Sequence, residues 1–97
     1  MKLPKISERE FMGQVVQFAA LRGWFAYHTY DSRRSAPGFP DLVLLRGTVL
    51  IVAELKRSPK EKPTAEQWAW LEAFKQTGAA TYVWTPDSWS EIEKVLM

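Results

Sequence analysis

The stretch from residue 38 to residue 56 constrains the fold most, because it contains two apolar, β-branched-rich runs separated by a Gly-Thr pair. Such a pair is typical of a β-hairpin with a two-residue turn whose first central position takes glycine. With Gly47 and Thr48 as the turn, the numbers of facing residues add up to 95. The sequence therefore predicts that Asp41 faces Glu54 at the open end of the hairpin, close to Lys56.

Both faces of the expected hairpin are apolar apart from this charged end. The alternating residues are Val43, Leu45, Leu50 and Val52 on one face, and Leu42, Leu44, Ile51, Ala53 and Leu55 on the other. Apolar residues on both faces are typical of central strands in a covered sheet. Directly opposed carboxylates have Cβ atoms about 4.5–5.5 Å apart and repel each other, which disfavours a purely structural hairpin. A divalent cation between them would remove this repulsion.

The combination of Asp41, Glu54 and Lys56 is typical of metal-dependent phosphodiester hydrolysis. Mg²⁺ prefers oxygen ligands and keeps several waters, so two carboxylates at a strand end can hold it beside a phosphate. A neighbouring lysine can orient or deprotonate a water, or stabilise the charge that develops on the phosphoryl group. The alternative is a surface hairpin that ends in ordinary solvated charges.

Length and composition indicate one domain over residues 1–97. The chain has 46% hydrophobic residues, enough for a core, and it has no cysteine, which excludes disulfides and thiolate metal sites. It has no leader-like start and no apolar run approaching 18 residues, so we expect a cytoplasmic protein without a membrane partner. The net charge of +2 permits nucleic-acid binding without requiring it.

The remaining sequence predicts alternating helices and strands. The elements expected outside the hairpin are a helix over 7–22, a strand over 24–29, a helix over 64–77, a strand over 80–85 and a helix over 88–96. The two longer helices begin with capping boxes, formed by Ser7 with Glu10 and by Thr64 with Gln67. The predicted order is therefore α-β-β-β-α-β-α.

Two polar residues are expected on the apolar stripes of these helices. Glu8 lies three residues before Phe11, and an inward carboxylate there would need a partner such as a metal cluster. The alternative is a first-turn acid favoured by the helix dipole. Gln67 lies four residues before Leu71, and either capping alone or a supporting role at the site explains it.

Basic and polar residues precede and follow the acidic cluster in the sequence. Apart from His28 in the expected strand over 24–29, they lie in the loop over 30–40 and in the connector over 57–63, and they suit contacts with DNA phosphates. The candidate DNA contacts are His28, Arg33, Arg34, Ser35, Arg57, Lys60 and Lys62. The alternatives are solvated basic loops and a packed histidine.

The element order and these motifs resemble the PD-(D/E)XK nuclease superfamily, and more narrowly the stand-alone VRR-NUC nucleases of phages and bacteria. The matching motifs are Ser7-Glu8, Gly23-Trp24, Tyr27-His28, Ser32-Arg33-Arg34-Ser35, Gly38-Phe39-Pro40-Asp41-Leu42, Glu54-Leu55-Lys56 and Thr64-Ala65-Glu66-Gln67. They cover nearly the whole chain. The resemblance implies an α/β, restriction-endonuclease-like fold with a central mixed sheet flanked by helices.

The resemblance also implies a set of site residues. Asp41, Glu54 and Glu8 would be metal ligands, with the Leu55 carbonyl as a further ligand, Lys56 as the catalytic lysine and Gln67 as its accompanying glutamine. The implied cofactor is Mg²⁺ or Mn²⁺. One departure is that the segment over 58–63 lacks the glycine often found between the lysine and the second helix.

Small members of this family are similar to archaeal Holliday-junction resolvases, which are homodimers. This resemblance implies a metal-dependent endodeoxyribonuclease that acts as a homodimer on branched DNA in a bacterial or phage-infected cell. The alternatives are a flap or general DNA nuclease of the same fold, and a DNA-binding accessory protein without catalytic activity.

Overall fold

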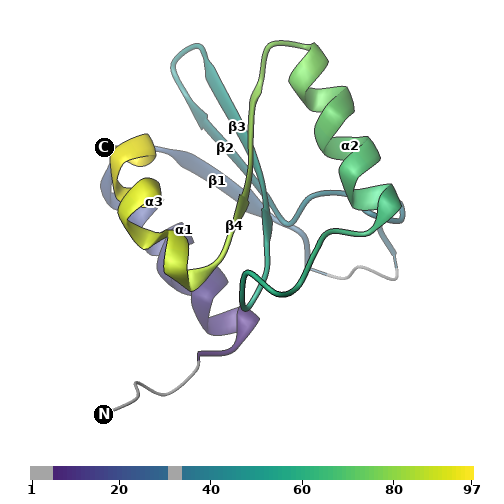
Figure 1. The fold of residues 1–97 in the computed structure, drawn as a ribbon. Helices are drawn as coiled ribbons and strands as arrows, with labels where there is room; N and C mark the ends of the chain where they lie inside the picture. Colours follow the sequence, from purple (N-terminus) through teal and green to yellow (C-terminus); the bar gives the residue numbers. More distant parts are fainter. Residues whose placement is uncertain (1–5, 31–33) are drawn as a thin grey trace.

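The computed structural model describes residues 6–30 and 34–97 (Figure 1). Arg33, one of the expected DNA contacts, lies outside the described residues. The elements are α1 (Glu8–Leu21), β1 (Phe25–His28), β2 (Leu42–Arg46), β3 (Val49–Leu55), α2 (Ala65–Gln76), β4 (Ala80–Trp84), the 3-10 helix η1 (Pro86–Ser88) and α3 (Trp89–Leu96). This order confirms the one predicted from the sequence, with η1 as an additional turn before the last helix.

The four strands form one mixed sheet in the order β1-β2-β3-β4 (Figure 1). β1, β2 and β3 pair antiparallel, whereas β4 runs parallel to β3. β2 pairs with β3 from Leu42 opposite Ala53 to Arg46 opposite Val49, which confirms the predicted turn and register. β2 and β3 are therefore the central strands, and the open end of their hairpin lies inside the sheet rather than at its edge.

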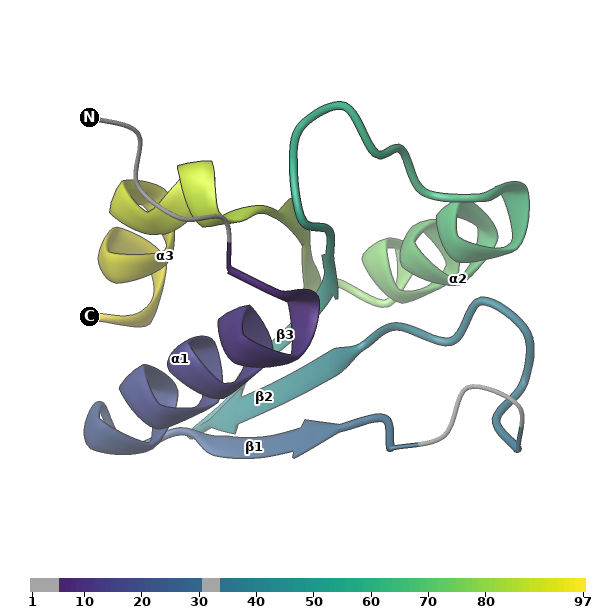
Figure 2. The same ribbon diagram turned by 90° about the horizontal axis from the view of Figure 1, so that it is seen from below.

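The main core lies between one face of the sheet and the helices α1 and α3. These two helices lie on the same side of the sheet, and α2 lies on the opposite side (Figures 1 and 2). Phe11 and Val15 of α1 and Ile92 and Leu96 of α3 are fully buried, whereas only Leu71 is buried on α2. No helix in the described part of the chain is both long and apolar enough to cross a membrane.

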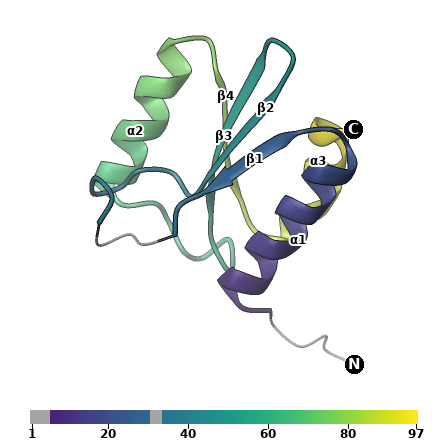
Figure 3. The same cartoon turned by 180° about the vertical axis from the view of Figure 1, so that it is seen from behind.

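The prediction that both faces of the hairpin are covered is correct for one face and only partly correct for the other. α2 packs against β3 and β4. On the same face, side chains of β1 and β2 remain exposed: Phe25 is 81% exposed, Tyr27 58% and Leu45 47%. A view from behind shows β1 at the edge of the sheet, away from α2 (Figure 3). A single helix is too narrow to cover four strands.

The hairpin turn is attached to the ends of α1 and α3 through one arginine. The guanidinium of Arg46 donates hydrogen bonds to the carbonyl oxygens of Arg22, Leu96 and Met97, at 3.0–3.3 Å. It also lies over the ring of Trp24, 4.3 Å from the ring centroid. This contact anchors the end of the hairpin that is remote from the acidic residues.

At the other end, the loop before β2 passes close to the first turn of α2. Gly38 has φ 82°, and a Cβ atom at this position would lie 2.6 Å from the backbone carbonyl carbon of Glu66. Close by, the indole N–H of Trp70 donates a 3.1 Å hydrogen bond to the Pro37 carbonyl, and the Trp70 ring packs edge-on against Phe39. Glycine therefore allows the segment leading to Asp41 to dock onto α2.

We predict that Gly38→Ala lowers the free energy of unfolding by roughly 1–3 kcal/mol, because the new Cβ meets backbone atoms in a conformation that alanine disfavours. Gly13→Ala in α1 is the matched control. A Cβ atom at Gly13 would have open space within 4 Å, so this change should stabilise the helix by about 0.5–1 kcal/mol. Urea unfolding followed by circular dichroism measures both changes, and equal effects of the two substitutions would contradict the proposed close approach.

Candidate active site

Two carboxyl groups meet at the open end of the β2–β3 hairpin. Glu54 lies near the end of β3 and is 1% exposed, and Asp41 immediately precedes β2 and is half-buried. The two side chains are close enough to share a proton in a hydrogen bond. Asp41 Oδ2 also accepts a 2.9 Å hydrogen bond from the backbone N–H of Leu55. The structure thus brings together the two acids that the hairpin register places opposite each other.

The environment of Glu54 strongly favours its neutral form. Burial, hydrogen bonding to Asp41 and the charge of Asp41 raise the pKa of Glu54 to about 9, and Lys56 opposes this shift. When both groups are ionised, Oε2 of Glu54 is buried without a hydrogen-bond partner among the described residues. A buried carboxylate oxygen that lacks a partner and adjoins a second carboxyl group suits a hard divalent cation. The donor set therefore fits Mg²⁺ or Mn²⁺.

Gln67, at the start of α2, has two structural roles at once. Its Oε1 accepts a 2.8 Å hydrogen bond from the Thr64 backbone N–H, which completes the capping box. Its Nε2 donates a 3.4 Å hydrogen bond to Oε1 of Glu54. Capping and support of the acidic pair were alternative explanations for this residue, and the geometry combines them.

Glu8 and Lys56 lie beside the two carboxyl groups. Glu8 is exposed rather than directed into the core, because the buried positions of α1 begin only at Phe11 and Glu8 lies in the turn before them. Partial burial and the charge of Asp41 nevertheless raise the pKa of Glu8, and Lys56 lowers it. Within residues 6–30 and 34–97, no three acidic or histidine side chains are close enough to hold a metal ion together. Asp41 and Glu54 are therefore a two-carboxylate set with Glu8 nearby.

Lys56 is held in position by the sheet. Its backbone N–H donates a 2.9 Å hydrogen bond to the carbonyl of Trp84 on the parallel strand β4, and its side chain is half-buried. The charge of Lys56 acts on both Glu54 and Glu8. The structure thus places the expected lysine beside the expected acids.

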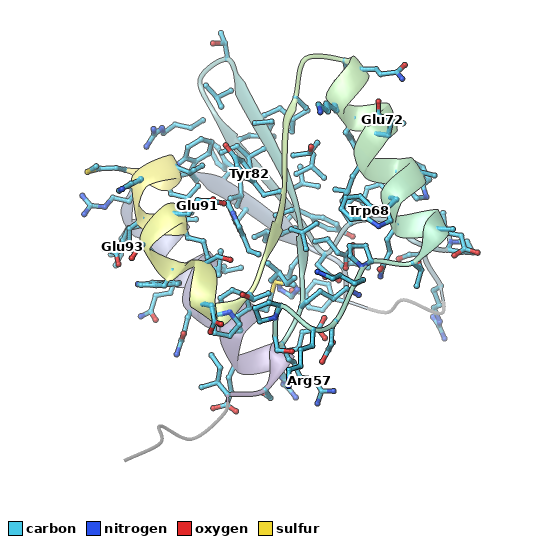
Figure 4. The ribbon with its side chains drawn as sticks, in the orientation of Figure 1. Arg57, Trp68, Glu72, Tyr82, Glu91 and Glu93 are labelled. Atoms are coloured by element: carbon cyan, nitrogen blue, oxygen red, sulfur yellow. The ribbon has the colours of Figure 1, made fainter. Side chains whose placement is uncertain are left out.

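The predicted DNA contacts lie in different surroundings. Arg57 forms an exposed 3.0 Å ion pair with Glu61 near the start of α1 (Figure 4). Lys60 and Lys62 are exposed on the same connector, and Arg34 is exposed on the loop before β2. His28 is half-buried, and Ser35 lines a hollow beside Asp41. The site is therefore approached by basic segments from two parts of the chain.

The hollow beside Asp41 is a feature that the sequence did not reveal. It has a volume of about 230 Å³, and its lining includes Tyr30, Phe39, Asp41 and Gln67. The two aromatic residues lie in an irregular loop, where no periodic spacing marks a side chain as part of a site. The only available signal was the presence of large aromatic residues in an otherwise polar, turn-rich segment.

Solved structures resemble this chain, whereas its sequence matches no family model and no curated protein. A solved VRR_NUC domain is 28% identical, with a TM-score of 0.62 over 87% of this chain and 91% of that one. A VRR_NUC domain protein is 18% identical, with a TM-score of 0.73 over 96% and 87% of the two chains.

A third solved structure is Hjc of Archaeoglobus fulgidus, a Holliday junction resolvase. It is 23% identical, with a TM-score of 0.53 over 81% of this chain and 65% of that one. These likenesses confirm the predicted class, an α/β domain with the restriction-endonuclease-like fold of the PD-(D/E)XK superfamily. Within this class, the chain is similar to VRR-NUC nuclease domains, as its motifs indicated.

We predict that, in the presence of a chelator, the protein loses stability as the pH rises from 5 to 9. The pKa of Glu54 is about 9 in the folded protein and near 4.5 when unfolded, so the stabilisation is complete below pH 4.5 and is lost as the pH rises through 9. The slope contributed by this group is at most about 1.4 kcal/mol per pH unit. Chemical unfolding at several pH values measures it.

Glu54→Gln should flatten this slope because the amide does not titrate. Glu10→Gln is the control: hydrogen bonds from Ser7 lower the pKa of Glu10, so its contribution is present at neutral pH and is lost only toward acid pH. The slope between pH 5 and pH 9 should therefore persist in this variant. An unchanged slope in Glu54→Gln would show that another group controls it.

Proposed function

We propose that this protein is a Mg²⁺- or Mn²⁺-dependent endodeoxyribonuclease that acts as a homodimer on branched DNA. The observation that carries the proposal is that Oε2 of Glu54, with both carboxyl groups ionised, is buried without a partner among the described residues. Glu54 lies beside Asp41 and two residues before Lys56. Further support comes from the likeness of the fold to VRR_NUC domains and to a Holliday junction resolvase.

The residues that would hold the cation are Asp41 and Glu54, with the Leu55 carbonyl as an additional oxygen donor. Glu8, which lies nearby, would complete the metal site through a water that the cation retains. Once bound, the cation would supply positive charge that polarises the scissile phosphate and stabilises the charge of the transition state. It would also offset the repulsion that raises the pKa of Glu54. Ligation of the ionised carboxylates would therefore release a proton.

The surrounding groups of the chain have separate roles in this proposal. The Leu55 N–H holds one oxygen of Asp41, and Gln67 holds Oε1 of Glu54, so the remaining oxygens face the site in fixed orientations. Lys56 would orient the attacking water through its ammonium group or stabilise the developing phosphoryl charge. Its half-buried position limits the competition from bulk water.

We assign phosphate contacts to the basic and polar residues around the site. They are His28, Arg33, Arg34, Ser35, Arg57, Lys60 and Lys62, of which Arg33 lies outside the described residues. Arg57 is available for this role, because its present partner Glu61 forms an exposed ion pair worth less than about 1 kcal/mol. A phosphate can therefore replace the carboxylate at low cost.

A homodimer would suit the geometry of branched DNA. One chain carries one candidate site, and symmetrical incision of a four-way junction requires two sites related by a twofold axis. A second copy of the chain would supply the second site. Flap cleavage or cleavage of linear DNA would not require this symmetry.

We predict that Asp41→Asn and Lys56→Ala each lower the rate of DNA cleavage at least about 100-fold, because each removes a charge from the reacting centre. Lys75→Ala is the matched control, since Lys75 lies in the last turn of α2, away from the Gln67 end. Single-turnover cleavage of labelled DNA gives the rates, and circular dichroism verifies folding. A folded Lys56→Ala protein that cuts at the wild-type rate would refute the assigned role.

We expect the purified protein to introduce symmetrical nicks in a four-way junction with Mg²⁺ or Mn²⁺ and to cut nothing with EDTA. Flap and linear duplex DNA are tested in parallel, and sedimentation gives the oligomeric state. If only flaps or linear duplex are cut, the proposed nuclease activity is supported and the proposed specificity for four-way junctions is contradicted. Metal-independent DNA binding without cleavage of any substrate would instead indicate an accessory DNA-binding protein.

A further inference from the structure

The hollow adjoins the donor set that suits a cation: Asp41 belongs to both, and Gln67 lines the hollow and donates a hydrogen bond to Glu54. Its volume of about 230 Å³ is several times the roughly 30 Å³ that one water occupies in the liquid. From its position and lining we infer that it receives one unstacked nucleobase of the DNA strand that is cut. This inference rests on the proposed function and names the substrate class more closely.

The charge of the described lining favours a neutral group inside the hollow over a phosphate. Among its described lining residues there is no lysine or arginine, and Asp41 contributes a carboxylate. A phosphate inside it would lie beside a negative charge without a cationic partner. An uncharged base can occupy it while the phosphate of the same nucleotide stays outside, next to the acidic pair.

The lining also matches the two chemical surfaces of a base. Tyr30 and Phe39 offer aromatic rings for its flat face, and Thr29 and Gln67 place polar side chains for its edge. The side chain of Thr29 donates a 2.9 Å hydrogen bond to the Pro40 carbonyl, which fixes the position of its oxygen as an acceptor. Such a combination of a stacking ring and edge contacts is how proteins hold unstacked bases.

Tyr30 is the residue that best distinguishes a base site from a simple surface depression. It is 83% exposed, yet its ring is held by His28, with ring centroids 4.2 Å apart and a 46° tilt. An exposed ring that is already supported on one side loses little freedom when a base stacks on it. Phe39 is held similarly, by edge-on packing against Trp70 at 5.1 Å.

A base inside a continuous duplex is stacked and paired, so it cannot reach such a hollow without the cost of unpairing. This cost is smallest where a nucleotide is already unpaired or next to a discontinuity. The favoured substrates are therefore DNAs with an unpaired or easily unpaired nucleotide beside the cut, such as branch points, flaps and gaps. Intact linear duplex would be cut more slowly.

The test compares Tyr30→Ala with Tyr30→Phe, which keeps the ring and loses only the hydroxyl. On flap and junction DNA, Tyr30→Ala should lower the cleavage rate about 5- to 150-fold, the range expected for loss of one base-stacking contact. Tyr30→Phe should lose much less than Tyr30→Ala, because the ring that stacks on the base is retained. A Tyr30→Ala protein that is folded and fully active on both substrates would overturn the inference.

A second arm removes the base from the DNA instead of the ring from the protein. Abasic sites are placed one at a time at the nucleotides flanking the incision. One position should lower the wild-type rate by about the factor seen with Tyr30→Ala, and the two losses should not multiply when they are combined. If the two losses of cleavage rate multiply, the ring does not hold a base. The same follows if Tyr30→Ala lowers the rate by the same factor at every abasic position.

Binding without cleavage separates failure of this inference from failure of the proposed function. Lys56→Ala protein is mixed with junction and flap DNA that carry 2-aminopurine at the branch-point nucleotides. One position should change its fluorescence on binding, and adding Tyr30→Ala should abolish the change. Binding without any such change contradicts the base site alone, absence of cleavage by wild-type protein contradicts the nuclease, and absence of DNA binding contradicts both.

Discussion

The burial of Glu54 against Asp41 is the constraint on which the rest of this structure depends. Two carboxyl groups can share the interior end of a hairpin only if one of them holds a proton or a cation lies between them. The structure retains this pair at the open end of the two central strands, with β1 and β4 on either side and Gln67 of α2 bonded to Glu54. Such an arrangement costs stability in the free protein, and under the proposed function a bound cation would offset this cost.

The surrounding elements are arranged around that pair. The left-handed conformation of Gly38 lets the loop before β2 touch the start of α2, where Gln67 donates a hydrogen bond to Glu54. Because Gln67 also caps α2, the position of the helix and the orientation of the Glu54 carboxyl are coupled. At the other end, Arg46 anchors the hairpin to α1 and α3, so the acidic pair belongs to a hairpin that is fixed at both ends.

The hairpin and its acidic end follow from the sequence because they depend on local information. A glycine-led turn sets the register, and the register alone brings Asp41 to Glu54. The exposure of Glu8 did not follow, since helical periodicity does not tell at which turn of a helix burial begins. The hollow beside Tyr30 could not be predicted either, because it arises from the packing of an irregular loop against α2. No repeat or spacing in the sequence encodes this packing.

The parallel pairing of β3 with β4 has a consequence for the order of folding. A two-residue hairpin closes in about 1–10 μs, whereas pairing β3 with β4 requires the chain to close over the connector and α2. Asp41 and Glu54 can thus meet in a hydrated hairpin long before β4 and α2 exclude water from them. The electrostatic cost of the pair therefore arises late in folding, when packing excludes water. Removing the charge of one of the two acids would then mainly slow unfolding and would have little effect on the first steps of folding.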